Sequence, residues 1–425
     1  MTKNLNQYLL PVALTAALAL PTGATATEPT AAAVLETYAN IALAGYEDSL
    51  ATAKTLKQAV DGLIAKPSEE ALGAARKAWL AARVPYQQTE VFRFGNAIVD
   101  DWEGRVNAWP LDEGLIDYVA PVYGTSSDEN PLYAINIIAN ASLKIGGAPV
   151  DASVITPQLL QSLHEAGEVE ANVTTGYHAI EFLLWGQDLN GTGPGAGNRP
   201  YTDFSSANCT GGNCDRRADY LRAATDLLIS DLQEMIANWM DKGAARTALL
   251  TGSPTAGLAA ILKGMGSLSY GELAGERIKL GLLLHDPEEE HDCFSDNTHN
   301  SHLYDAVGIQ NVFLGRYMRV DGRVVHGASL ADLVKNAAPE LESMLRERLQ
   351  ATVDALLDMG QRAESVEAYD QMIGTDNAPG NAVVQAVIDA LLDQTHAIQK
   401  TARVLQVGPV EFEGSDSLDA PEKAY

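Results

Sequence analysis

Residues 176–186, Gly-Tyr-His-Ala-Ile-Glu-Phe-Leu-Leu-Trp-Gly, contain the pair of side chains best suited to chemistry in this sequence. Apart from His178 and Glu181, the residues between the bounding glycines are apolar or aromatic, which predicts a buried helix. A spacing of three places both side chains on one helical face, with Cβ atoms roughly 5–6 Å apart. Because an unpaired buried charge is costly, partners must reach this pair from elsewhere in the fold. Imidazole and carboxylate together suit iron or zinc.

The same motif is incomplete as a zinc peptidase site. Both the His-Glu-x-x-His pattern and its inverted form fail, because positions 179 and 182 are Ala and Phe. Catalytic zinc takes three protein ligands, so the remaining ligand would have to come from a distant segment. A metal-dependent peptidase or hydrolase therefore stays open as an alternative, although no complete zinc motif supports enzymatic activity.

A second group of functional side chains follows one helix at intervals of four, three, four and three residues. The pattern predicts a single stripe along that helix, made of Trp79, Arg83, Tyr86, Glu90 and Arg93. Such a stripe is either a solvated face or, given its aromatic members and the apolar residues around it, a buried one. In the buried case the arginines would hold Glu90 ionised and lower its pKa.

Two further segments contain candidate site residues. In the loop 107–117, Trp109 precedes a proline, and Asp112 either caps the next helix or belongs to the site. The run 288–302 is rich in acidic residues and histidine and looks like a metal cluster. It does not complete a di-iron site, because the Glu-x-x-His pattern of such bundles is required twice and occurs here once.

Composition narrows the class of partner. The chain has 425 residues with 29 basic and 56 acidic side chains, a formal net charge of −27. That charge argues against nucleic acid as a partner, since phosphate binding needs a basic surface. It fits either solubility in salty surroundings or a field that concentrates cations.

The beginning of the chain has the pattern of a signal peptide. Lys3 precedes an apolar stretch, and Ala24-Thr25-Ala26 fits a signal-peptidase site, so residues 1–26 are expected to be removed on export. We expect an exported or periplasmic protein, soluble after cleavage and not integral to a membrane, since no later segment has about 20 uninterrupted apolar residues. In an exported chain, Cys209 and Cys214 are expected to form a local disulfide.

The elements that would position these residues are mostly helices. Apolar residues recur at helical spacing in the segments Ala31 to Ile64, Glu69 to Phe94, Asp215 to Met240, Leu258 to Leu284, Leu330 to Gln361 and Ala382 to Val404. One small β-hairpin is expected at Tyr317 to Val325, with Asp321-Gly322 at its turn. A glycine-rich linker, 191–214, is the natural boundary between helical units at 30–190 and 215–410. A faint similarity between 181–191 and 311–322 favours an internal duplication, and 411–425 is expected to be a disordered acidic tail.

Taken together, the motifs resemble the imelysin family of exported bacterial proteins. The resemblance is carried, in the family's order, by Arg83-x-x-Tyr86-x-x-x-Glu90-x-Phe92-Arg93-Phe94, Trp109-Pro110-Leu111, Gly176-x-His178-x-x-Glu181, Phe294-Ser295-Asp296-Asn297-Thr298 and Leu314-Gly315-Arg316-Tyr317. It implies an all-α fold of two similar four-helix bundles with a site at their interface. It also implies a link to iron uptake, in place of the family's former assignment to metallopeptidases.

Three functional hypotheses follow from the residues and the resemblance. The first is a periplasmic protein that binds iron or an iron chelate during uptake, handing it to membrane or periplasmic partner proteins. The second is the metal-dependent peptidase, and the third is a non-catalytic adaptor whose His/Glu/Arg cluster is a structural ion-pair network. The expected metal ligands are His178, Glu181 and Glu90, with iron as the expected metal and zinc as the alternative. The expected ligand-binding residues are Arg83, Tyr86, Arg93, Trp109, Asp112, Ser295, Asp296 and Thr298.

Overall fold

Helices make up most of the chain, as the sequence predicts. The computed structural model describes residues 29–128 and 130–423, so the expected signal peptide at 1–26 lies outside the described residues. The α-helices are α1 (Ala31–Ala65), α2 (Glu69–Gln87), α3 (Ala97–Asn107), α4 (Glu113–Ile116), α5 (Pro157–Leu163), α6 (Gly176–Trp185), α7 (Cys214–Trp239), α8 (Ala244–Leu250), α9 (Pro254–Ser267), α10 (Leu280–Leu284), α11 (Thr298–Leu314), α12 (Leu330–Ala337), α13 (Pro339–Ser365), α14 (Tyr369–Ile373), α15 (Ala378–Val404) and α16 (Asp416–Asp419).

Shorter helical turns connect these helices. The 3₁₀ turns are η1 (Glu90–Phe92), η2 (Pro121–Tyr123), η3 (Tyr201–Phe204), η5 (Pro287–Glu289) and η6 (Pro421–Lys423), and η4 (Leu268–Lys279) is a π-helix. The π-helix joins α9 to α10, so the helix expected at Leu258 to Leu284 is interrupted by a change of winding rather than by a break.

Strands occur among the described residues as two short antiparallel pairs. The predicted hairpin is confirmed as β3 (Arg316–Met318) and β4 (Val324–His326), with Tyr317 opposite Val325. The pair β1 (Ser142–Ile145) and β2 (Ala148–Asp151) was not predicted, because four-residue strands are too short for an alternating pattern to stand out. Its turn, Gly146-Gly147, has both residues at positive φ, which glycine adopts freely.

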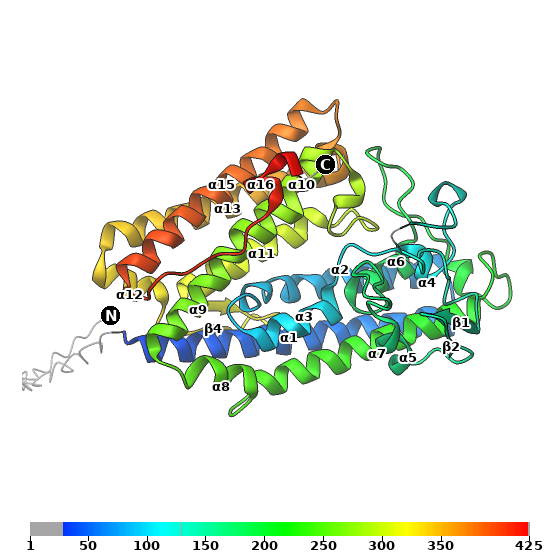
Figure 1. Ribbon diagram of the computed structural model, residues 1–425, viewed down its shortest axis with the longest axis horizontal. Helices are drawn as coiled ribbons and strands as arrows, with labels where there is room; N and C mark the ends of the chain where they lie inside the picture. The colour runs from blue at the N-terminus through cyan, green and yellow to red at the C-terminus, as the bar shows by residue number, and fades with distance from the viewer. Residues whose placement is uncertain (1–28, 129, 424–425) are drawn as a thin grey trace, which may run out of the picture.

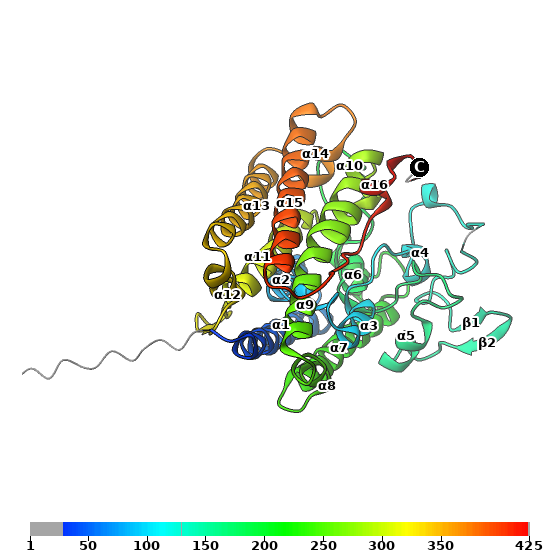
Figure 2. The ribbon, with the colours of Figure 1, turned by 60° about the vertical axis from the view of Figure 1, so that its left-hand side comes forward.

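The long helices lie in two sets (Figures 1 and 2). In the first set α1 packs along α2 and α7, and α6 packs against both α2 and α7. In the second set α13 packs against α11 and α15, and α15 also contacts η4. Helix α11 contacts α2 as well as α13 and so joins the sets. The expected boundary at 191–214 does not divide the packing, because α7 follows it in sequence yet packs on α1; the duplication stays a prediction.

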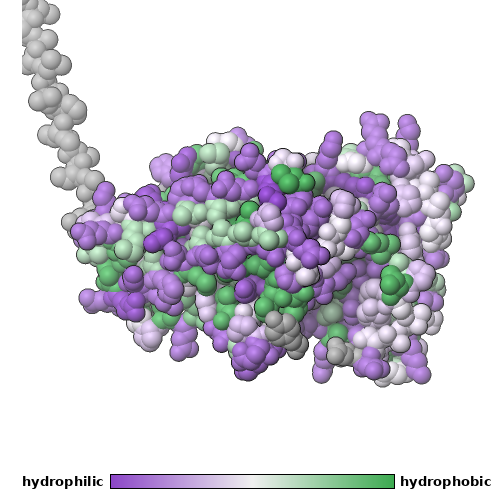
Figure 3. Space-filling view, turned by 90° about the horizontal axis from the view of Figure 1, so that it is seen from above, coloured by the Kyte–Doolittle hydropathy of each residue, from purple (hydrophilic) through white to green (hydrophobic). Residues whose placement is uncertain are grey.

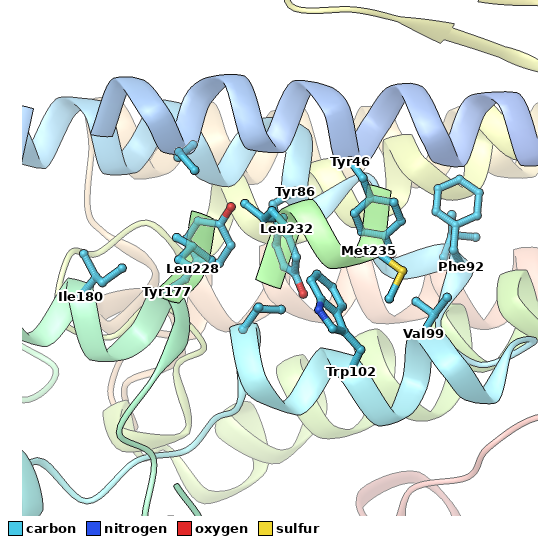
Figure 4. Packing of buried hydrophobic residues seen from close by; sticks show 14 of the residues in the cluster. Tyr46, Tyr86, Phe92, Val99, Trp102, Tyr177, Ile180, Leu228, Leu232 and Met235 are labelled. Carbon is cyan, nitrogen blue, oxygen red and sulfur yellow. The ribbon is translucent and has the colours of Figure 1, made fainter. Parts of the chain in front are cut away.

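The main hydrophobic core runs through both sets of helices. It extends from Val34 in α1 to Val407 after α15, while a smaller cluster lies within the second set, between Leu273 and Leu391. Aromatic side chains fill much of the first set (Figure 4): the Tyr46 and Trp102 rings meet edge to face at 5.6 Å between centroids. The core thus holds α6 and α11 at fixed positions on either side of the candidate site.

The C-terminal segment differs from its prediction as a disordered tail. Residues 411–423 lie along α9 and η4 (Figure 1), where the Glu413 N–H donates to Ser267 Oγ at 3.0 Å and the Ser417 hydroxyl donates to the Gly275 carbonyl at 3.0 Å. Glycines make this approach possible, since a Cβ at Gly266 would lie 2.2 Å from the Phe412 ring. The acidic composition of the segment gave no sign of this fit; residues 424–425 lie outside the described part.

The surface agrees with the composition. The face shown in Figure 3 is largely hydrophilic, with apolar residues in scattered patches. Within the described residues, no helix combines the length and the apolar character needed to cross a membrane.

Candidate functional site

Helix α6 presents His178 and Glu181 from inside the protein. All ten of its residues are buried, as the apolar run predicts. The helix begins at Gly176, where φ is +81° and a Cβ would lie 2.4 Å from the Val106 carbonyl oxygen. Only glycine permits this close approach to the end of α3. The motif's first glycine therefore positions the two polar side chains that follow it.

His178 and Glu181 meet directly, and a distant segment completes their contacts. Nδ1 of His178 lies 3.1 Å from Oε2 of Glu181. The other oxygen of Glu181 accepts hydrogen bonds from the Ser295 N–H at 3.0 Å and from its hydroxyl at 2.6 Å. The sequence required a partner from elsewhere in the chain, and Ser295, before α11, supplies it.

Asp292 is the central carboxylate of the site. It accepts a hydrogen bond from Arg83 at 2.8 Å, and its Oδ1 lies 3.9 Å from Nδ1 of His178 and 3.4 Å from Nδ1 of His291. Its backbone N–H donates to the Thr298 hydroxyl at 2.8 Å. Asp292 is therefore held by its own backbone and by an arginine, close to two imidazoles.

The two imidazoles and this carboxylate form a compact group. One potential ligand atom each from His178, His291 and Asp292 lie within 4.8 Å of one another. The His178 and His291 rings are 4.7 Å apart between centroids, and the Trp109 ring meets His291 edge to face at 5.5 Å. The Trp109 indole N–H donates to the Glu290 carbonyl at 3.1 Å, which fixes the segment carrying His291. Two imidazoles and a carboxylate are a ligand set found at non-haem iron and catalytic zinc centres.

Burial sets the protonation of these groups. Burial, with the nearby Arg83 charge, lowers the pKa of His178 to about 3, and burial with Arg277 lowers the pKa of His291 well below its usual range. Both imidazoles are therefore neutral near pH 7, the form that binds metals. Burial opposes ionisation of Asp292, but the Arg83 guanidinium holds its pKa well below the usual range. Burial and Asp292 raise the pKa of Glu181.

Arg83 links the site to the first set of helices. Besides Asp292, it donates to the Asn107 side-chain carbonyl at 2.6 Å. Its guanidinium lies over aromatic rings, 5.8 Å from the Tyr86 centroid and 5.2 Å from that of Tyr177. Tyr86, a predicted ligand-binding residue, thus lies beside Arg83 and packs on Tyr177 with ring centroids 4.7 Å apart.

Glu90 and Arg93 belong to a different ion-pair group. Helix α2 ends at Gln87, so the predicted stripe from Trp79 to Arg93 does not continue along one helix. Just beyond this end, the Thr89 hydroxyl donates to the Tyr86 carbonyl. Glu90 pairs instead with Arg277 of η4 at 2.8 Å. Arg93 pairs with Asp100, Glu103 and Glu272 at 2.8, 3.5 and 3.3 Å.

The remaining predicted residues are also placed by their contacts. Asp112 accepts a hydrogen bond from Asn130 and precedes α4 without capping it through its side chain. Asp296 faces Glu290 and Asp370 rather than His178. Cys209 and Cys214 are joined as a disulfide with Cα atoms 5.9 Å apart.

Sequence reasoning missed His291 and Asp292 as members of the site. They lie more than a hundred residues from the His178 motif, in the acidic run 288–302, which does not complete a di-iron motif. The sign that could have identified them is that the same run contains Ser295 and Thr298, which were predicted to bind the ligand.

The fold and the site together define a helical protein with a buried imidazole–carboxylate centre between two sets of helices. The family model described as Imelysin matches residues 42–398, and the chain belongs to the imelysin family. Iron-regulated protein A of Synechococcus elongatus is 24% identical over 327 residues, covering 74% of this chain and 72% of that protein. A crystal structure of a protein assigned as an iron-regulated protein A precursor, from Parabacteroides distasonis, has the same fold, with a TM-score of 0.62. It is 19% identical and covers 90% of this chain and 97% of its own.

Proposed function

We propose that this protein binds iron, as an ion or within a chelate, at His178, His291 and Asp292, and that it acts in iron uptake outside the cytoplasm. The observation that carries the proposal is the convergence of two imidazoles and a carboxylate within 4.8 Å. Relatives named iron-regulated protein A favour iron among the metals that such a set binds. Export is supported by the signal-peptide pattern at 1–26 and by the Parabacteroides relative, which is named a precursor.

The surroundings of His178 support a ligand role. Its Nδ1 faces Glu181, while Nε2 has no hydrogen-bond partner among the described residues. The nitrogen of His178 that lies 3.9 Å from Oδ1 of Asp292 is the same Nδ1, so an ion bound between them would also lie beside the Glu181 carboxylate. Glu181 therefore stays in the proposed site beside His178. Glu90, which the sequence favoured as a ligand, is occupied by Arg277, and Asp292 takes its place in the proposed set.

A hydrolase is the second candidate, because three protein ligands of this kind also suit catalytic zinc. Burial weighs against it. His178, His291 and Asp292 are exposed by 1%, 1% and 0%, which leaves no room for a polypeptide beside them. The adaptor hypothesis rests on the buried ion pair between Arg83 and Asp292. It expects no metal to bind at this site, whereas the first proposal expects iron to bind there.

The test is calorimetric titration of the metal-stripped protein with ferrous ion under anaerobic conditions, and with ferric and zinc ions. The native protein should bind ferrous ion saturably, and His178→Gln and His291→Gln should each weaken binding at least tenfold. The control is His396→Gln, which changes an exposed histidine on α15 and should bind as the native protein does. Circular dichroism checks that each variant is folded.

Absence of iron binding by the native protein would overturn the proposal and favour the adaptor. Binding of zinc accompanied by peptide hydrolysis that His178→Gln abolishes would favour the hydrolase instead. Equal binding by the native protein and the site variants would show that the metal is held elsewhere.

A further inference from the structure

A second group of ionisable side chains includes Glu290, the residue directly before His291. It consists of Glu290, Asp296 and Asp370, here called the carboxylate cluster. One oxygen from each of the three carboxylates lie within 4.8 Å of one another. The residues come from the end of η5, from the loop before α11 and from the first turn of α14. Segments that are distant in sequence therefore bring three negative groups together.

These carboxylates are buried without partners. Glu290 and Asp370 are exposed by 1% and 0%. Both oxygens of Glu290, both of Asp370 and Oδ1 of Asp296 have no hydrogen-bond partner among the described residues. Leaving buried acceptors unsatisfied is expensive, and most such groups in folded proteins are paired. The cluster needs something that these residues do not provide.

Several other buried carboxylates of this protein pair with arginine. Asp117 meets Arg199 at 2.7 Å and Arg217 at 2.6 Å, and Asp292 meets Arg83 at 2.8 Å. For the carboxylate cluster, no nitrogen of a basic side chain within residues 29–128 and 130–423 lies within 4.0 Å. Among the described residues, no basic side chain therefore offsets the three carboxylates of this cluster.

The electrostatics describe the same deficit. Burial, then neighbouring acidic groups including Asp188, raises the pKa of Asp296 to about 7 and that of Asp370 to about 7. A bound cation would reverse these shifts by favouring the ionised forms.

The chemistry of the donors indicates the kind of cation. All three side chains offer oxygen, and three carboxylates supply up to six oxygens if each binds through both. Ca²⁺ takes 6–8 oxygens at about 2.3–2.6 Å and accepts irregular geometry, whereas Mg²⁺ demands octahedral geometry and retains water. We propose that Glu290, Asp296 and Asp370 form a second cation site, for Ca²⁺, distinct from the imidazole-containing site. Its ion would tie the segment before α11 to α14.

The test uses the full protein after treatment with a chelator, titrated calorimetrically with CaCl₂ and with MgCl₂. The native protein should bind Ca²⁺ saturably and more tightly than Mg²⁺, with a rise in its unfolding temperature. Glu290→Gln/Asp370→Asn should weaken Ca²⁺ binding at least tenfold. Without Ca²⁺ this double variant should unfold no lower than the native protein, since it loses only mutual repulsion, and that readout also shows that it folds.

The matched control is Glu340→Gln/Asp358→Asn, which neutralises two exposed carboxylates on α13. It should bind Ca²⁺ as the native protein does. Equal losses in the two double variants would overturn the proposal, because they would show diffuse attraction by an acidic surface. No Ca²⁺ binding by the native protein would show that the cluster is held by protons alone, and tighter binding of Mg²⁺ would overturn the choice of ion. His291→Gln should leave Ca²⁺ binding intact if the two sites are distinct.

Discussion

Replacing Arg83 by glutamine should destabilise the protein strongly in a way that a metal ion can reverse. The side chain is buried and donates to Asp292 at 2.8 Å and to Asn107 at 2.6 Å. Removing one partner of a buried ion pair typically costs about 3–5 kcal/mol, because the remaining charge stays buried and unpaired. We expect Arg83→Gln to lower the free energy of unfolding by that amount at pH 7.

A metal at the imidazole–carboxylate site would supply the lost positive charge. An ion that binds only the folded state, at a concentration one hundred times its dissociation constant, raises the free energy of unfolding by about 2.7 kcal/mol. Because the ion no longer competes with Arg83 for Asp292, the stabilisation should be larger in Arg83→Gln than in the native protein. Urea denaturation with and without ferrous ion, followed by circular dichroism, measures both quantities. Arg222→Gln, at an exposed pair with Asp219, is the control and should change stability by less than about 0.5 kcal/mol.

The pH dependence of the Arg83→Gln effect has a definite sign. Arg83 lowers the pKa of Asp292, so the pair contributes stability above the ordinary aspartate pKa and loses it as pH falls. The difference between native and variant should therefore be largest near neutrality and shrink below about pH 4. A loss below about 1 kcal/mol at pH 7 would contradict the assigned role of Arg83. Equal effects of ferrous ion on variant and native protein would contradict the competition for Asp292.

Two further predictions concern other parts of the fold. In chelator, the unfolding free energy of the native protein should fall as pH rises from about 4 to about 7, because Asp296 and Asp370 keep protons that the unfolded chain releases. Urea titrations across this range should give a shallower slope for Glu290→Gln/Asp370→Asn, and identical slopes would refute the assignment. Gly308→Ala should cost about 1–3 kcal/mol, because its Cβ would lie 2.6 Å from the Gln88 carbonyl where α11 crosses α2. Thermal unfolding measures this loss, with Gly360→Ala as the control. The added Cβ at Gly360 would lie 3.7 Å from its nearest neighbour, so that variant should be as stable as the native protein or more stable. Equal losses of stability in the two variants would show that α11 and α2 are not tightly packed at Gly308.

The sequence predicted the helices because their apolar residues recur at a helical period that tertiary packing reinforces. It could not predict the π-helix at Leu268–Lys279, because one extra residue per turn leaves no clear mark in an apolar pattern. In the structure, a side-chain contact reflects this winding: Arg277 Nε donates to Glu272, five residues earlier, at 2.8 Å. The same guanidinium also donates to Glu90 at 2.8 Å.

The candidate site was predictable only where its residues lie close together in the sequence. Local spacing determined that His178 and Glu181 share a face, since a helix fixes the distance between positions three apart. The identity of their partners depended on how α11 and its preceding loop pack against α6, which no local pattern encodes. Glu90 was misplaced because the prediction assumed one uninterrupted helix from Trp79 to Arg93, whereas α2 ends at Gln87.

The route of the main hydrophobic core has a consequence for the modularity of this protein. Side chains from α1 and α2 share one apolar interior with side chains from α9, α11 and α15, whereas only the second set also has a separate cluster. Cutting the chain at the glycine-rich segment 191–214 would leave α1 without α7 and expose much of that shared interior to water. The two halves therefore cannot be exchanged between relatives as interchangeable parts. Substitutions on one side of the interior must be matched by changes on the other.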